Sequence, residues 1–191
     1  MHLRTALIVL ALTAAGCNQQ NSASQGGAPK APQLDAPVPG AQPSAVCAPV
    51  NDAATAATGQ LTMSVALHLP DAGADNADTQ EVLTLRGATG LVVEANITGA
   101  VSPATQVQGQ TLRALLGLPV EEPQVLVYRV TNETHPEGVQ GLCGGEANAA
   151  YVVVWEPSTP GSASMKLLGT TGGAPGAGAA RACPMLEYRR G

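Results

Sequence analysis

The residues best suited to chemistry lie together in the segment Thr131-Asn-Glu-Thr-His-Pro-Glu137. Glu133, His135 and Glu137 alternate there, and two carboxylates beside an imidazole could act as a general acid–base set or as metal ligands. Cys143 follows nearby, but no C-x-x-C or H-x-x-x-H spacing typical of a zinc site accompanies it. The simpler interpretation is a polar turn after a strand. This loop is therefore a weak candidate site, and we assign no catalytic residue, no metal and no cofactor.

Two other groups of residues invite the same test. The acidic segment Asp71–Asp78 contains several oxygen ligands for calcium, but Gly73 occupies the third position and no Glu closes the loop at the twelfth. A solvated turn is the simpler interpretation. Cys47 with His68 or His135 would resemble a nucleophile and its base, but no local feature indicates an activated thiol. The sequence also contains no G-x-S-x-G motif of a hydrolase.

The few aromatic residues lie in the second half of the chain, which contains three Tyr, one Trp and no Phe. Tyr151 and Trp155 are predicted on one face of the same strand, where they would form a recognition surface if they were exposed. The alternative is that the rings form the core around a disulfide. Without Phe, most of the core must consist of Val, Leu, Ala and Ile.

Hydrophobic alternation predicts most of the strands. In the segment 61–69, Leu61, Met63 and Val65 face one way, and residues 82–86 and 91–98 form a hairpin around Gly87-Ala-Thr-Gly90. The remaining strands are predicted over residues 124–131, with Leu126, Tyr128 and Val130 opposite Val127 and Arg129; over 150–156, a central strand; over 164–168; and over 185–189, an edge strand.

One helix is predicted over residues 110–116, with Gly117 as its C-terminal cap. Residues 51–59 are interpreted as a loop or a short helical turn. The fold class is therefore mainly β: a small antiparallel barrel or sandwich with one short helix, preceded by a disordered tether.

The N-terminus has the order of a secretory signal, with Arg4, an apolar run over residues 7–12 and then small residues. The run ends in Ala14-Ala15-Gly16-Cys17, which resembles the lipobox of bacterial lipoproteins, although Ala14 occupies the position where the family prefers Leu. The resemblance implies a signal peptide over residues 1–16, lipidation of Cys17 with acyl chains such as palmitate, and a membrane anchor. Asn18 stands where an Asp would resemble an inner-membrane retention signal, which favours the outer membrane, facing the periplasm.

Composition divides the rest of the chain. Residues 17–45 comprise the lipidated cysteine and a linker rich in Pro, Gly, Ser and Ala that cannot form a core. Residues 46–191 are long enough for a single β-rich domain. Once Cys17 is lipidated, Cys47, Cys143 and Cys183 remain, so one internal disulfide and one thiol are expected in an oxidising compartment. We favour Cys143–Cys183, while pairings that use Cys47 stay open.

The formal net charge of −5 and the lack of a basic cluster argue against a nucleic-acid partner. We expect a lipoprotein of the cell envelope that acts as a non-catalytic binding or assembly accessory, with an envelope protein as its partner. One alternative is an inhibitor of an envelope-directed enzyme such as lysozyme, because an acidic domain suits a cationic enzyme. Another alternative is a metal-binding or enzymatic domain that uses the His135 loop.

Overall fold

The computed structural model describes residues 44–68, 80–145, 147–157 and 164–190 of the chain. The predicted signal peptide, Cys17 and nearly all of the linker lie outside these residues, as does the acidic segment 71–78. Within the described residues the elements are β1 (Ala45–Pro49), α1 (Asp52–Ala57), β2 (Leu61–His68), β3 (Gln80–Gly87), β4 (Val92–Val101), β5 (Gln106–Val107), β6 (Gln110–Thr111), α2 (Leu112–Leu116), β7 (Val125–Thr134), β8 (Tyr151–Trp155), β9 (Met165–Thr171) and β10 (Arg181–Arg190).

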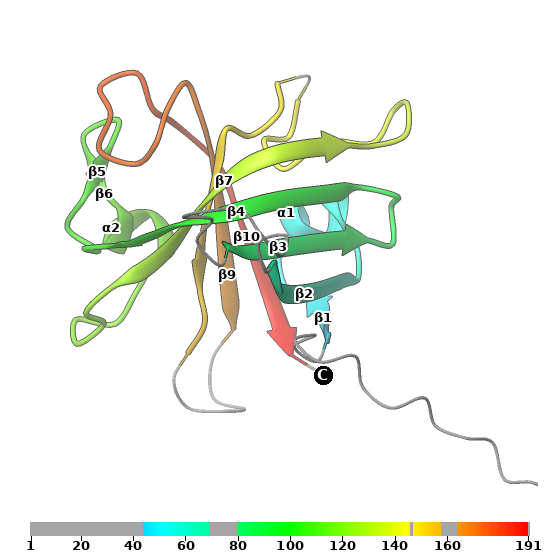
Figure 1. Cartoon of the computed structure of the whole chain (residues 1–191), viewed down its shortest axis with the longest axis horizontal. Coiled ribbons are helices and arrows are strands. Elements are labelled where there is room, and N and C mark those ends of the chain that lie inside the picture. Colours follow the sequence, from blue (N-terminus) through cyan, green and yellow to red (C-terminus); the bar gives the residue numbers. More distant parts are fainter. Residues whose placement is uncertain (1–43, 69–79, 146, 158–163, 191) are drawn as a thin grey trace, which may run out of the picture. The chain divides into compact units, whose positions relative to one another are not determined.

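Eight of the strands close into an antiparallel barrel in the order β1-β10-β9-β8-β7-β4-β3-β2 (Figure 1). This confirms a mainly β fold and selects the barrel over the sandwich. The described residues contain two short helices: α2 is the predicted helix, and α1 lies in the segment 51–59, which was interpreted as a loop or a short helical turn. Residues 185–189 were predicted as an edge strand, but β10 pairs with β9 on one side and β1 on the other. Closure therefore leaves the barrel without an open sheet edge.

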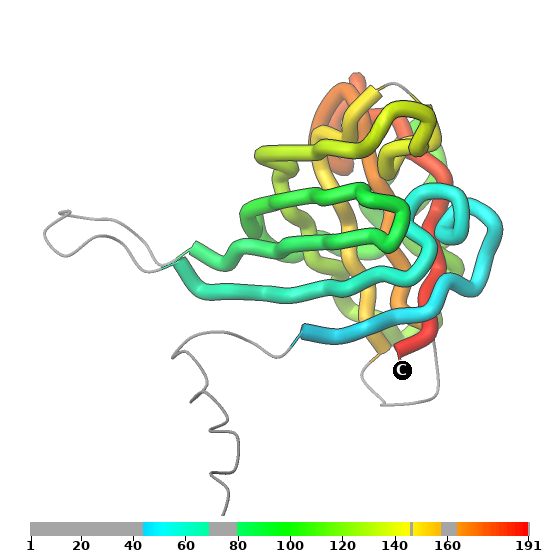
Figure 2. Tube along the Cα trace, turned by 90° about the vertical axis from the view of Figure 1, so that its right-hand side faces the viewer, coloured from blue at the N-terminus to red at the C-terminus, as the bar shows by residue number. Residues whose placement is uncertain are grey.

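The alternation predicted for β2 to β4 is confirmed where the strands line the barrel. Leu61 and Met63 are buried in the interior, and so are Leu83 and Leu85 of β3 and Val93 of β4. Further along β2 the burial decreases, and Leu67 on the same face is 48% exposed. The far end of β2 and the start of β3 extend beyond the neighbouring strands (Figure 2), so the inward face there has less to pack against.

The helix α1 closes one end of the barrel (Figure 2). The side chain of Asn51 caps it by accepting a hydrogen bond from the backbone N–H of Ala54 at 3.0 Å. Ala54 and Ala57 are buried in the same core as the barrel interior. The Thr58 hydroxyl after the helix lies 2.7 Å from the phenolic oxygen of Tyr188, which is fully buried. Small residues on α1 thus let the helix lie directly on the end of the barrel.

A second core covers the outer face of β7 to β10. The segment between β4 and β7, which carries β5, β6 and α2, folds over this face (Figure 1). Strand β8 is buried on both faces, as its uninterrupted apolar run predicts: Val152 and Val154 face the barrel interior, whereas Val153 and Trp155 face the outer core. The members of the outer core are Val107, Leu112, Leu116, Leu118, Val125, Val127, Val153, Trp155, Leu168 and Ala180.

The alternation predicted for β7 is confirmed from Leu126 to Val130. Tyr128 and Val130 belong to the barrel core and Leu126 lines the open end of the barrel, whereas Val127 is buried in the outer core. Beyond Val130 the register with β4 shifts at Thr131, since Glu94 pairs with Asn132 and Ala95 with Val130. This irregularity places Glu133 opposite the buried Val93.

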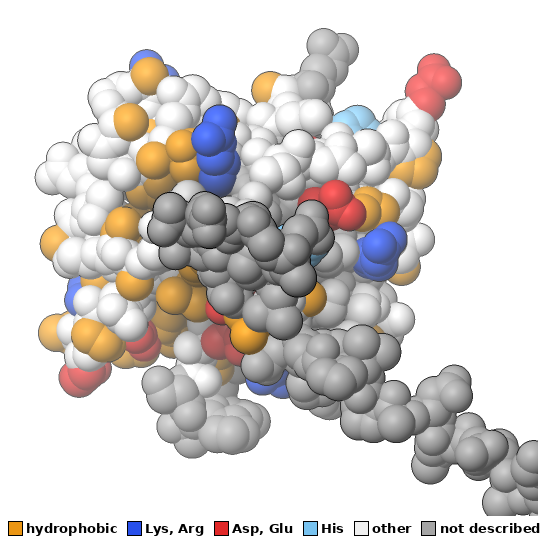
Figure 3. Space-filling view, in the orientation of Figure 1, with side chains coloured by type: hydrophobic (Ala, Val, Ile, Leu, Met, Phe, Trp, Pro, Cys, Tyr) orange, Lys and Arg blue, Asp and Glu red, His pale blue; other side chains and the backbone are white. Residues whose placement is uncertain are grey.

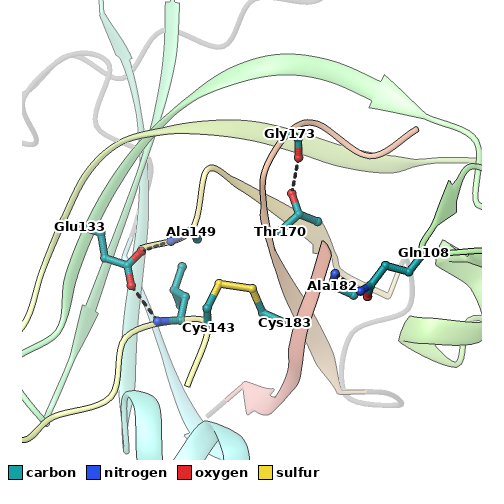
Figure 4. Close-up of a disulfide and its surroundings, with 9 residues drawn as sticks. Gln108, Glu133, Cys143, Ala149, Thr170, Gly173, Ala182 and Cys183 are labelled. Atoms are coloured by element: carbon teal, nitrogen blue, oxygen red, sulfur yellow. Dashed lines mark hydrogen bonds between the residues drawn. A yellow bond between two sulfur atoms is a disulfide. The ribbon is translucent and has the colours of Figure 1, made fainter. Parts of the chain in front are cut away.

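The favoured disulfide is present, linking Cys143 to Cys183 of β10 (Figure 4). Cys47 lies in β1, forms no disulfide and is fully buried in the barrel core. Burial raises the pKa of the Cys47 thiol. Neither helix of the described residues has the length and apolar character needed to cross a bilayer.

Tyr188 gives the fold a predicted pH dependence. Burial raises the pKa of its hydroxyl from 10.0 to about 12. Between these values the unfolded chain has released the proton and the folded chain still holds it, so stability must fall as the pH rises. We expect Tyr188 to contribute a loss of about 2 kcal/mol across this range, measured by urea unfolding. Tyr188→Phe should make the slope shallower by this contribution, whereas the control Tyr151→Phe, outside the barrel interior, should leave it unchanged. An unchanged slope in Tyr188→Phe would refute the assignment.

Candidate binding cavity at the open end of the barrel

The end of the barrel opposite α1 contains a cavity of about 460 Å³. Such a volume is typical of a small-molecule site, and a barrel of eight strands is just wide enough to hold one small ligand. The lining residues come from both ends of the described chain and from its middle. They are Ala45, Met63, Val65, Glu81, Leu83, Glu122, Gln124, Val125, Leu126, Tyr128, Val154, Trp155, Glu156 and Arg190.

The inner wall of the cavity is apolar. Met63, Leu83 and Val154 belong to the barrel core and are almost completely buried, and Val65 packs against that core with partial exposure. These side chains enter from β2, β3 and β8. The cavity is therefore a continuation of the core that side chains do not fill.

A tyrosine–glutamate pair lies on the wall. The Tyr128 hydroxyl donates a hydrogen bond of 2.6 Å to Oε1 of Glu81, which comes from the extended start of β3. Burial, followed by the hydrogen bond and the negative charge of Glu81, raises the pKa of Tyr128 well above its ordinary value. The phenol is protonated at neutral pH, and its oxygen retains the capacity to accept a hydrogen bond.

A second carboxylate is held by the only Trp of the chain. The indole Nε1 of Trp155 donates to Oε2 of Glu122 at 2.8 Å. The ammonium of Lys166 lies 5.8 Å from the centre of the Trp155 ring and donates to the carbonyl of Leu116 at 2.8 Å. Lys166 thus binds the C-terminus of α2. These contacts hold the outer core and the rim of the cavity together.

The third carboxylate of the rim, Glu156, forms an ion pair with Arg190, with 3.3 Å between Oε2 and Nη2. Arg190 is the only cationic side chain among the lining residues, so the lining carries three negative charges and one positive charge, a net of −2. In the view of Figure 3, the described Lys and Arg side chains lie apart from one another. The rim is therefore acidic, and the face in view has no concentrated positive charge to offset it.

The His135 loop does not form the predicted arrangement. Glu133 lies within β7 and not in a turn, and its buried carboxylate accepts the backbone N–H of Leu142 at 2.8 Å and of Ala149 at 2.7 Å (Figure 4). His135 has its Nδ1 3.3 Å from the carbonyl of Pro136, and Glu137 is exposed. The register shift at Thr131 brings Glu133 opposite the buried Val93, and the carboxylate of Glu133 organises the loop that carries Cys143. Among the described residues, no cluster of three or more His, Cys, Asp or Glu is arranged to hold a metal.

The other sequence candidates are also separated. Cys47 pairs with Leu61 at one end of β2, and His68 stands at its other end, about 23 Å away along a strand of this length. Tyr151 and Trp155 share the outer face of β8, as predicted, but Trp155 is only 5% exposed and belongs to the outer core. Tyr151 packs against the same core and is half-buried. The two rings therefore do not form an exposed pair.

Sequence reasoning missed the residues that make the cavity. Glu81, Glu122, Glu156 and Arg190 are spread over more than half of the chain and follow no motif. Each stands just inside or just beyond the end of a predicted strand, which is the one signal that could have suggested a shared rim. The strand order that brings them together is a property of the closed barrel.

The fold and the cavity define a class: a closed antiparallel barrel of eight strands, covered by a helix at one end and open to a cavity at the other. Comparison with protein-family models, with curated proteins and with solved structures finds no match to this chain. What the cavity does is therefore argued from its own geometry.

Proposed function

We propose that this protein is a lipid-anchored binding accessory of the bacterial cell envelope, without catalytic activity, that holds its ligand at the open end of the barrel. The observation that carries the proposal is the cavity itself, which has an apolar wall inside the barrel and polar groups at its rim. A barrel that α1 closes at one end, and whose core side chains leave a cavity at the other end, is the arrangement expected of a protein that binds a small ligand inside its barrel.

The envelope location rests on the sequence of the first 17 residues and is supported by the disulfide, which persists in oxidising compartments. The chain enters the barrel at Ala45, which also lines the cavity. In our proposal a lipid at Cys17 anchors the chain that enters the barrel at this point, on the outer membrane.

The proposal of binding without catalysis is supported by how the sequence candidates are used. Both oxygens of Glu133 accept backbone hydrogen bonds inside the protein, so the fold itself uses that carboxylate. The carboxylates at the rim are likewise held by the neutral donors Tyr128 and Trp155 or by Arg190. Such groups suit recognition of a ligand better than its transformation.

The test is crosslinking and capture of the lipidated protein from intact envelopes. Val65→Trp fills the cavity, and Val50→Trp places the same ring at an exposed position near the closed end. We expect the bound component to be lost in Val65→Trp and in the unanchored Cys17→Ser chain, and to be kept in Val50→Trp. Equal recovery from Val65→Trp and Val50→Trp would contradict the assignment of the site.

A second candidate function is inhibition of a cationic enzyme that attacks the envelope, such as lysozyme. The three carboxylates of the rim favour it, because they could receive Lys or Arg side chains of such an enzyme. A panel of lysozymes assayed with micromolar protein tests it. Inhibition that weakens on Glu81→Gln would favour this candidate over the first, and a panel without inhibition would eliminate it.

A further inference from the structure

The polar side of the cavity is unevenly charged. Glu81 and Glu122 accept hydrogen bonds from Tyr128 and Trp155, which are neutral donors, so both carboxylates keep their full negative charge. Glu156 is the only one that faces a cation, Arg190. Because that guanidinium is already paired, the cavity offers an anionic ligand no free positive group among its lining residues.

The apolar side lies deeper. Met63, Leu83 and Val154 form a wall that is continuous with the barrel core. A ligand that fills the space must therefore present hydrocarbon to this wall, while its outer end reaches the carboxylates. The apolar wall and the acidic rim together favour a ligand with an apolar body and one positively charged end.

We propose that the cavity binds small amphipathic organic cations, with the apolar part inside the barrel and the ammonium group at Glu81 and Glu122. This inference rests on the proposed binding function and adds the chemical class of the ligand. A fatty acid has the apolar body but would bring its carboxylate to a rim with a net charge of −2, from three Glu and one Arg. A neutral alcohol would gain binding free energy from contact with the apolar wall, but none from attraction to the excess negative charge of the rim.

The experiment uses the full chain carrying Cys17→Ser, in buffer without detergent, and three probes with the same chain length: n-octylammonium, 1-octanol and octanoate. Trp155 is the only Trp and lines the cavity, so its fluorescence reports binding directly, and calorimetry provides the dissociation constants. The cavity-filling variant Val65→Trp, measured by calorimetry, must lose all three probes.

We expect octylammonium to bind most tightly, octanol more weakly and octanoate weakest. Glu81→Gln keeps an oxygen to accept from Tyr128 but removes the charge, and we expect about fivefold weaker binding of octylammonium with unchanged binding of octanol. The double variant Glu81→Gln/Glu122→Gln should weaken the binding of octylammonium further. Glu137→Gln removes the same charge beyond the far end of β7 and should have no effect. Added salt should weaken the binding of octylammonium and should not weaken the binding of the other two probes.

Octanol or octanoate binding as tightly as octylammonium would overturn the cationic ligand but keep the cavity as a binding site. Absence of binding of all three probes to the Cys17→Ser chain, folded as judged by thermal unfolding, would also overturn the proposal. Neither outcome affects the result of the envelope capture. In that experiment the comparison of Val65→Trp with Val50→Trp tests whether the open end of the barrel is the binding site. The two proposals therefore fail separately.

Discussion

The double variant Cys143→Ser/Cys183→Ser is expected to lose about 4 kcal/mol of unfolding free energy, because its disulfide closes a loop of 40 residues and so restricts the unfolded chain. The link ties the loop between β7 and β8 to the last strand of the barrel. Urea unfolding under conditions where both chains are reversible measures the difference.

The unmutated protein with its disulfide reduced is the matched control and should show the same loss. Cys47→Ala is a second control, since it removes a buried sulfur that forms no disulfide. It should cost about 1 kcal/mol. If the double variant lost no more than Cys47→Ala, the stabilising function of the link would be refuted.

Replacing Glu133 with Ala is expected to cost about 3 kcal/mol of unfolding free energy. Two buried backbone N–H groups, of Leu142 and Ala149, would lose the carboxylate that accepts their hydrogen bonds. The fit around this carboxylate is close: a Cβ at Gly141 would lie 2.5 Å from Oε1 of Glu133. Two buried backbone N–H groups of the loop that carries Cys143 therefore depend on this single side chain.

Glu133→Gln provides an intermediate case, because an amide offers one acceptor oxygen where the carboxylate offers two. We expect it to be destabilised by about half as much. Glu137→Ala, at an exposed carboxylate of the same segment, should change stability by less than about 0.5 kcal/mol. Equal losses for Glu133→Ala and Glu137→Ala would show that the buried carboxylate does not support the loop.

Much of the barrel follows from local patterns. Alternation in β2, the Gly87–Gly90 turn and the doubly apolar run of β8 each predict the observed strand, because these segments obey one periodicity over their whole length. The helix α2 follows from its leucines and from Gly117, which adopts the left-handed conformation at φ 57°. The strand signals did not reveal closure, since an edge strand and a paired strand have the same pattern.

The site could not be predicted in this way. Glu133 was interpreted as part of a polar turn because the residues around it are polar, but register in β7 points it inward to two backbone donors. The cavity requires Ala45 and Arg190, near the two ends of the described chain, to meet around one barrel mouth. Pairing of β1 with β10 causes this, and it is a contact between distant segments that no local pattern encodes.

The central claim is that the open end of the barrel is where this protein binds its ligand or partner in the envelope. The most direct measurement is site-specific photo-crosslinking in intact cells, with the reactive side chain at Leu126 of the cavity or at Val50 near α1. These residues are 39% and 44% exposed, so the two probes are equally accessible. We predict one dominant product from Leu126 and none from Val50. The same products from both positions, or none from Leu126 in the lipidated protein, would contradict the claim.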